Sequence, residues 1–134
     1  MSDVILHSSS SSLKYKFVDF NILGSKSITQ RALIINALMN SNEKISNLSN
    51  SSDTVVLNKA LKSSNNTVNV SNSGTALRFL ISFFALKNKE VLIHGDEYLF
   101  TRPIHQLIQM LNSIGANVMF LNNSVIIHKG HLTG

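Results

Sequence analysis

The sequence predicts a mixed α/β fold built from two similar units, and two observations support this. The segments 28–39 and 76–86 are apolar nearly all the way round, as expected of helices that other elements cover on every side. Each follows a turn that contains glycine and serine, and each carries an arginine near its start, Arg31 or, 47 residues later, Arg78. A strand pattern and then an amphipathic helical pattern follow in each half. We therefore expect an internal duplication, with chance similarity as the alternative.

The first half is expected to alternate strands and helices. Polar and apolar residues alternate over 14–22, which indicates a strand. Asp53 directly precedes an amphipathic segment and is a typical helix cap. In chain order we expect strands at 3–7 and 14–22 separated by a flexible serine tract, a helix from the turn at 24–27 to Met39, a strand at 44–48, and a helix at 54–62.

The second half repeats this pattern and adds a hairpin. Pro103 suits the first position of a helix, and Gly115 suits the position just after its end. Asn122-Asn123 separates two strand-like segments and predicts a tight turn. We expect strands at 67–71 and 89–94, a helix from the turn at 72–75 to Leu86, a helix from Pro103 to near Gly115, and strands at 117–121 and 124–129.

The composition excludes several classes of protein. At 134 residues and 43% hydrophobic content, the chain is long enough for one domain with a real core. It has no cysteine, so disulfides and thiolate metal sites are excluded, and its five histidines show no metal-ligand spacing. The net charge of +5 favours anionic partners, but the lysines are scattered and do not favour nucleic acid. We find no signal peptide and no apolar stretch long enough to span a bilayer, and we expect a cytoplasmic protein.

The turn Gly24-Ser25-Lys26-Ser27 is the first candidate site for an anion. A helix N-terminus offers backbone N–H groups without helical partners and a partial positive charge. Lys26 adds a cation, Ser27 adds a hydroxyl, and Arg31 lies one turn further along the same face. Ser25 separates Gly24 from the lysine, so the turn is not a Walker A loop. The alternative is a serine cap beside a solvated lysine.

Two further turns repeat this chemistry. In Asn72-Ser73-Gly74-Thr75, Gly74 would let a ligand approach the backbone closely, although an ordinary helix cap is the alternative. Arg102 precedes Pro103, which would place a guanidinium at a third helix N-terminus, although a surface arginine is the alternative. Three such turns predict one or two anionic ligands at one end of the domain. No set of nucleophile, base and acid with interpretable spacing is present.

Four segments in this order resemble signatures of the EPSP synthase (3-phosphoshikimate 1-carboxyvinyltransferase) family. They are 23–33, 48–54, 72–78 and 95–104, and only together are they specific. The sequence departs from the family pattern at three places: Leu23 stands where proline is usual, Ser71 where glycine is frequent, and Asp53 alone remains of a usual aspartate pair.

The resemblance implies a fold that agrees with the duplication. The family fold is an inside-out α/β barrel whose domains contain three βαβαββ repeats with helices buried among sheets. This chain would form part of the N-terminal domain and contain about two repeats. We expect an N-terminal strand segment at 1–20, a first repeat at 21–71 and a second repeat at 72–134.

The resemblance also implies a reaction. It is the transfer of the enolpyruvyl group of phosphoenolpyruvate to the 5-hydroxyl of shikimate 3-phosphate. Lys26, Ser27 and Arg31 would bind shikimate 3-phosphate, while Lys26, Gly74 and Arg102 would bind phosphoenolpyruvate. The resemblance assigns no catalytic residue, metal or cofactor to this chain, so the isolated chain is expected to be inactive and to need the rest of the enzyme.

Three alternatives to this function remain. In the related UDP-N-acetylglucosamine enolpyruvyl transferases, asparagine follows the lysine, so Ser27 and Arg31 favour the shikimate enzyme. A non-catalytic module that binds phosphorylated metabolites is the second alternative. A basic nucleic-acid binder is the third.

Overall fold

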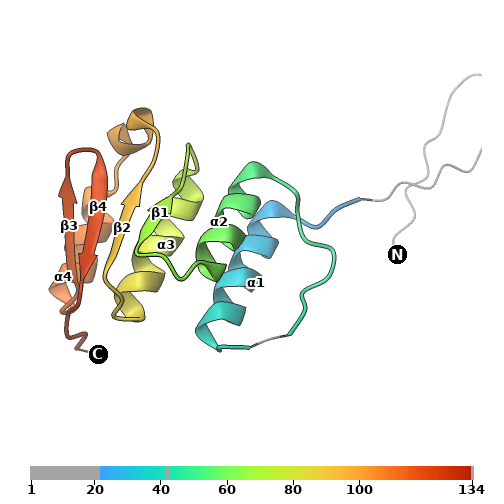
Figure 1. The fold of residues 1–134 in the computed structure, drawn as a ribbon, viewed down its shortest axis with the longest axis horizontal. Coiled ribbons are helices and arrows are strands. Elements are labelled where there is room, and N and C mark those ends of the chain that lie inside the picture. The colour runs from blue at the N-terminus through green and yellow to red at the C-terminus, as the bar shows by residue number, and fades with distance from the viewer. Residues whose placement is uncertain (1–21, 42, 134) are drawn as a thin grey trace, which may run out of the picture.

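A computed structural model describes residues 22–41 and 43–133, so the strand expected at 3–7 and all but the last residue of the one at 14–22 lie outside the described residues (Figure 1). The helices are α1 (Lys26–Leu38), α2 (Ser52–Lys62), α3 (Gly74–Leu86), α4 (His105–Ser113) and the short 3-10 helix η1 (Glu97–Thr101). The strands are β1 (Thr67–Asn69), β2 (Val91–His94), β3 (Asn117–Leu121) and β4 (Ser124–His128).

The strands form one sheet in the order β1-β2-β4-β3. β1 and β2 are parallel, and α3 makes the crossover between them, as a parallel pair requires. β4 runs antiparallel to both β2 and β3. The predicted hairpin between β3 and β4 is confirmed. Asn122 and Asn123 have φ of 49° and 54°, the left-handed conformation of a two-residue turn whose twist matches that of the strands.

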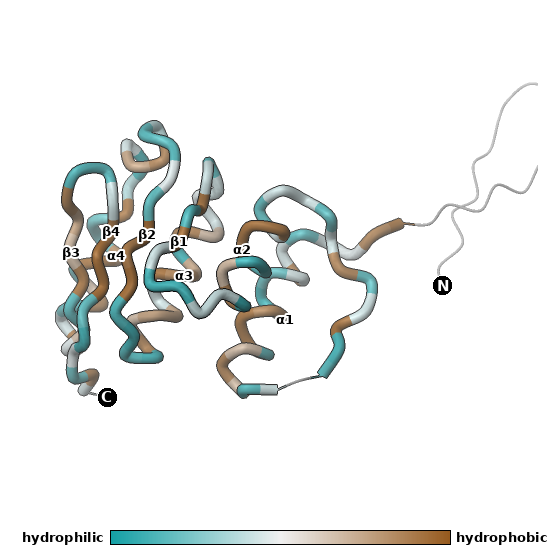
Figure 2. Tube along the Cα trace, in the orientation of Figure 1, coloured by the Kyte–Doolittle hydropathy of each residue, from teal (hydrophilic) through white to brown (hydrophobic). Residues whose placement is uncertain are grey.

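The helix α3 occupies the centre of the fold. It contacts all three other α-helices and strands β2, β3 and β4, and Figure 2 shows hydrophobic residues along both the helix and the strands beside it. Leu77, Leu80 and Ile81 are fully buried. The prediction that an apolar helix at 76–86 is covered by other elements is confirmed for α3 except at its last residue, Leu86, which is 57% exposed.

The helix α1 does not match the same prediction within the described residues. Leu33 is buried on its inner face, but Ile28, Ile35 and Met39 are 70%, 56% and 71% exposed. The physical reason is position: α1 lies at the edge of the described fold, and its contacts with other elements are mainly with α2 and α3 (Figure 1). Its outer face therefore meets no other described element.

The strand predicted at 44–48 is wrong. This segment is irregular, although Ile45 and Leu48 pack against the core. Asn47 has a φ of 50°, which interrupts an extended conformation. The carbonyl oxygen of Asn47 instead accepts a hydrogen bond of 3.1 Å from the backbone N–H of Gly24, which ties the segment to the start of α1.

Two predicted helix starts are also wrong. Ser51, and not Asp53, caps α2, because its hydroxyl accepts a 3.4 Å hydrogen bond from the Thr54 N–H. Pro103 is not the first residue of α4, which begins only after Ile104, a fully buried side chain at the cap position. Arg102 instead lies directly after η1, at the C-cap position of that short helix. The predicted end is confirmed, since Gly115 has a φ of 96° just past the helix.

Candidate anion-binding site

The first predicted turn places three polar side chains at the start of α1. Lys26 and Ser27 are the first two residues of the helix, and their backbone N–H groups lack helical partners, as at every helix start. Arg31 donates from Nη1 to the carbonyl oxygen of Ser27 at 2.9 Å, so the guanidinium folds back over the first turn. Ser25 is at the cap position but accepts no hydrogen bond through its side chain. The turn therefore exposes two cations at a positive helix end.

The second predicted turn forms the start of α3. Ser73 is 1% exposed and caps the helix, because its hydroxyl accepts a 3.1 Å hydrogen bond from the Ala76 N–H. Arg78 Nη1 donates to the carbonyl oxygen of Gly74 at 3.1 Å, the same four-residue contact that Arg31 makes in α1. The two helix starts are thus built alike.

Two guanidinium groups converge on Gly74. A Cβ atom at this position would lie 2.9 Å from Arg102 Nη1 and 3.2 Å from Arg78 Nη1. Arg78 also donates from Nη2 to the carbonyl oxygen of Pro103 at 3.3 Å, and Arg102 lies over the Tyr98 ring at 5.7 Å. Arg78 therefore ties the Gly74 turn to the loop that carries Arg102. The structure brings Arg102 to Gly74 through this loop, although the helix start predicted for it is wrong.

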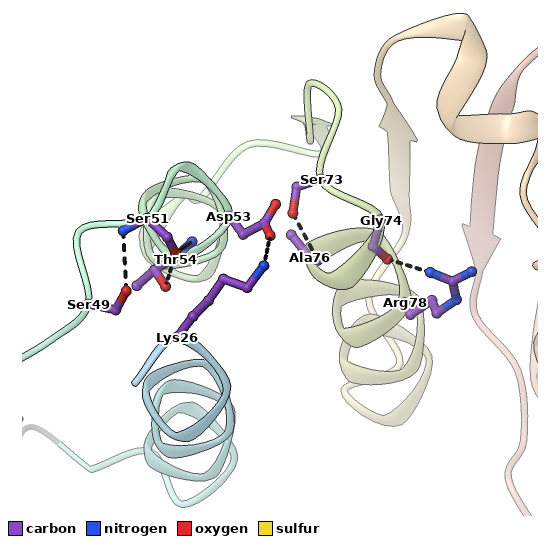
Figure 3. Close-up of polar contacts among 9 residues, drawn as sticks. All are labelled: Lys26, Ser49, Ser51, Asp53, Thr54, Ser73, Gly74, Ala76 and Arg78. Carbon is purple, nitrogen blue, oxygen red and sulfur yellow. Dashed lines mark hydrogen bonds and ion pairs between the residues drawn. The ribbon is translucent and has the colours of Figure 1, made fainter. Parts of the chain in front are cut away.

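Asp53 connects the two turns. Lys26 Nζ lies 2.8 Å from Asp53 Oδ2, the one ion pair found among residues 22–41 and 43–133. Figure 3 shows the carboxylate of Asp53, on α2, between the Lys26 ammonium on α1 and the Ser73 hydroxyl at the start of α3. Asp53 is the residue that we wrongly predicted to be the cap of this helix. The signal that could have identified it is Ser51, two residues earlier, which can cap the helix itself and leave the carboxylate available.

The surroundings of Asp53 keep its carboxylate ionised. Burial alone would raise its pKa. The hydrogen bond from Lys26, the nearby Ser73 hydroxyl and the positive charges of Lys26 and Arg102 outweigh burial and hold the pKa of Asp53 below its usual value. Asp53 is therefore negatively charged at neutral pH, beside the two cations Lys26 and Arg102.

The predicted site residues fall into two groups. Lys26, Gly74 and Arg102 surround the Asp53–Ser73 junction, whereas Ser27 and Arg31 extend along the exposed side of α1. The described part of the chain contains no cluster of histidine and acidic residues suited to a metal ion. It also contains no helix that is long and apolar enough to cross a membrane. What remains is a cationic surface at two helix N-termini, suited to phosphate and carboxylate groups.

A groove lies away from this cationic surface. It measures about 680 Å³, and its lining includes Phe83, Phe84, Lys87 and Lys89, near the C-terminal ends of α1 and α3. Lys87 Nζ donates to the carbonyl oxygen of Leu38 at 3.3 Å, and Lys89 donates to carbonyl oxygens beyond α2. Lys87 thus satisfies a backbone acceptor that the end of α1 leaves open, and Lys89 satisfies acceptors of the loop after α2, so the groove has a structural explanation.

The fold of this chain is similar to that of a solved enzyme structure. The EPSP synthase of Acinetobacter baumannii matches it with a TM-score of 0.69 at 17% identity, over 86% of this chain and 33% of that one. The predicted fold class, part of an EPSP synthase-like α/β barrel, is confirmed by this match.

The sequence comparisons then establish the family. The family model for EPSP synthase (3-phosphoshikimate 1-carboxyvinyltransferase) matches residues 57–133, and the chain belongs to this family. The 3-phosphoshikimate 1-carboxyvinyltransferase of Bacteroides fragilis (strain YCH46) is 39% identical over 99 residues, covering 74% of this chain and 24% of that protein. The enzyme of the same name from Buchnera aphidicola subsp. Baizongia pistaciae is 32% identical over 126 residues, covering 75% and 30%. The chain thus spans about a quarter to a third of these curated relatives.

Proposed function

We propose that this chain supplies one half of the substrate site of an enzyme that makes 5-enolpyruvylshikimate 3-phosphate. That enzyme transfers the enolpyruvyl group of phosphoenolpyruvate to the 5-hydroxyl of shikimate 3-phosphate and releases phosphate. The observation that carries the proposal is the cationic surface at the starts of α1 and α3, with Arg31 and Arg78 bound back to their own first turns. Both substrates are phosphorylated carboxylates, so each needs fixed positive charge.

The proposed roles follow the two groups of residues. Ser27 and Arg31 bind shikimate 3-phosphate from the exposed side of α1. Gly74 and Arg102 bind phosphoenolpyruvate, with the guanidinium of Arg102 on its phosphate. Lys26 contacts both substrates, a role supported by its ion pair with Asp53, which lies beside the second turn. These residues contribute orientation and electrostatic stabilisation.

The proposed reaction proceeds by addition and elimination, and it needs groups that donate and remove protons. None of the residues assigned here has that role. We therefore propose that the 134-residue chain binds its ligands weakly and does not turn over, and that the remaining part of the enzyme supplies these groups. Phosphate release at enzymic rates from both substrates and the isolated chain would contradict this. A cytoplasmic location, without nucleic acid as partner, belongs to the same proposal.

An amide NMR titration of the chain tests the assignment. Shikimate 3-phosphate should shift the signals of Lys26, Ser27 and Arg31 at millimolar concentration, and phosphoenolpyruvate should then shift those of Gly74 and Arg102. Shikimate without its phosphate is the matched control and should shift the α1 signals far less. Shifts with UDP-N-acetylglucosamine instead would favour the related transferases. A well-dispersed spectrum that responds to neither substrate would contradict the proposed site.

A further inference from the structure

We propose that Asp53 is a positioning residue of this site, whose carboxylate holds the Lys26 ammonium at the junction of the two helix starts. The inference rests on the proposed function, because Lys26 is the residue assigned to both substrates. Its basis is the 2.8 Å contact between Lys26 Nζ and Asp53 Oδ2, together with the placement of Asp53 beside the capping Ser73.

Asp53 is the fixed partner of the pair. Its side chain is 20% exposed, whereas that of Lys26 is 48% exposed. The neighbouring Thr54 is 2% exposed, and its hydroxyl lies 2.9 Å from that of Ser51, which secures the first turn of α2. The helix α2 packs against both α1 and α3. A short carboxylate on a packed helix start has little freedom, so the longer Lys26 side chain adopts the position that the carboxylate sets.

The negative charge of Asp53 has two opposite effects on an anionic ligand. It repels the ligand directly, and it orders the lysine that the ligand must meet. Ordering a long side chain during binding normally weakens affinity by roughly two- to twelvefold, so a lysine held in advance recovers that factor. The positioning role predicts that this second effect operates only through Lys26.

A double-mutant cycle separates the two effects. Binding of shikimate 3-phosphate is measured by NMR titration for the chain, D53A, K26M and the double variant. The direct charge effect of D53A is the same with or without Lys26. Positioning adds a loss of about two- to twelvefold only where Lys26 is present. D96A is the matched control, because it removes one negative charge from an exposed side chain outside the ion pair, and it should show no coupling to Lys26. Equal effects of D53A in both backgrounds would overturn the inference.

A measurement without ligand keeps the inference separate from the proposed function. The two Hε protons of Lys26 should have distinct NMR shifts in the chain at pH 7 and should merge in D53A, while those of Lys59 are unchanged. Merged Hε signals in the unmodified chain would overturn the positioning role. Distinct signals together with no response to shikimate 3-phosphate would support the positioning of Lys26 and count against the proposed substrate.

Discussion

Replacing Gly74 by alanine should damage ligand binding much more than stability. The new Cβ would lie 2.9 Å from the nearest guanidinium nitrogen of Arg102, closer than normal packing allows, and 3.2 Å from that of Arg78, which is tighter than most contacts. Both contacts are with the ends of flexible side chains, which can move. The residue has an ordinary φ at the start of a helix, where alanine gains about 0.4–1 kcal/mol over glycine. We therefore expect a net change in the free energy of unfolding within about 1 kcal/mol.

The main effect of G74A should be a loss of affinity for phosphoenolpyruvate, caused by displacement of Arg102. Moving its guanidinium away removes one charge-assisted hydrogen bond to phosphoenolpyruvate, which is worth about 1.5–3 kcal/mol, or roughly 10- to 150-fold in affinity. Urea unfolding gives the stability, and the Nε–Hε signals of Arg78 and Arg102 report the displacement with and without ligand. G115A is the contrasting control: Gly115 has a φ of 96°, and its Cβ would run into the His131 carbonyl, so it should lose about 1–3 kcal/mol or more.

Either of two results would contradict the expected behaviour of G74A. G74A could lose as much stability as G115A, which would mean that the guanidinium groups cannot move aside. Alternatively, the signals of both arginines could stay unchanged in G74A, which would mean that they do not lie over the glycine.

Three further predictions use urea unfolding as the readout. S73A should lower the free energy of unfolding by about 0.5–2 kcal/mol, because the Ser73 side chain caps α3. S25A should lower it less, since the Ser25 side chain makes no capping hydrogen bond. Equal losses in the two variants would contradict this. Asp53 has a lowered pKa in the folded state, so its contribution is present above its unfolded pKa of about 3.9 and is lost as the pH falls through the folded pKa. D53N should therefore lower the free energy of unfolding by up to about 1 kcal/mol at pH 7 and by progressively less as the pH falls below about 3.9. A loss that does not decrease with falling pH would argue against the ion pair. S71G should raise the free energy of unfolding by about 0.5–1 kcal/mol, because Ser71 has a φ of 48°, which glycine adopts without strain. N47G should raise it less, since asparagine tolerates this conformation. An unchanged stability of S71G would contradict backbone strain at Ser71.

The sequence predicted most of the elements because their signals are local. The apolar run of α3, the paired asparagines of the hairpin and Gly115 at the end of α4 each depend on neighbouring residues only. The predicted division into repeats at 21–71 and 72–134 stays a prediction, although the matching contacts of Arg31 and Arg78 agree with a duplication.

The failures share a different cause, which is dependence on distant partners. The helix α1 has the composition of a buried helix, but its outer face meets no other described element, so Ile28 and Met39 are exposed. The segment at 44–48 has two apolar residues that suit a buried face, Ile45 and Leu48, but it pairs with no other described strand. Burial of Ile104 delays the start of α4 past Pro103. A sequence pattern gives the propensity of a segment and cannot say which surface will cover it.

In the candidate site, too, the local features could be predicted from the sequence and the long-range contacts could not. Its turns are visible in the sequence because a glycine, a serine and a cation lie within a few residues. The ion pair of Lys26 with Asp53 spans 27 residues, and the approach of Arg102 to Gly74 spans 28, so neither has a local signal. Both contacts arise because α2 and the loop after η1 pack beside the start of α3.

The most direct test of the account is to follow the guanidinium Nε–Hε signals of Arg31 and Arg102 in one sample while each substrate is added in turn. Shikimate 3-phosphate should shift the Arg31 signal first, and phosphoenolpyruvate should then shift the Arg102 signal. Shifts confined to the signals of Lys87 and Lys89, in the groove at the opposite helix ends, would contradict it.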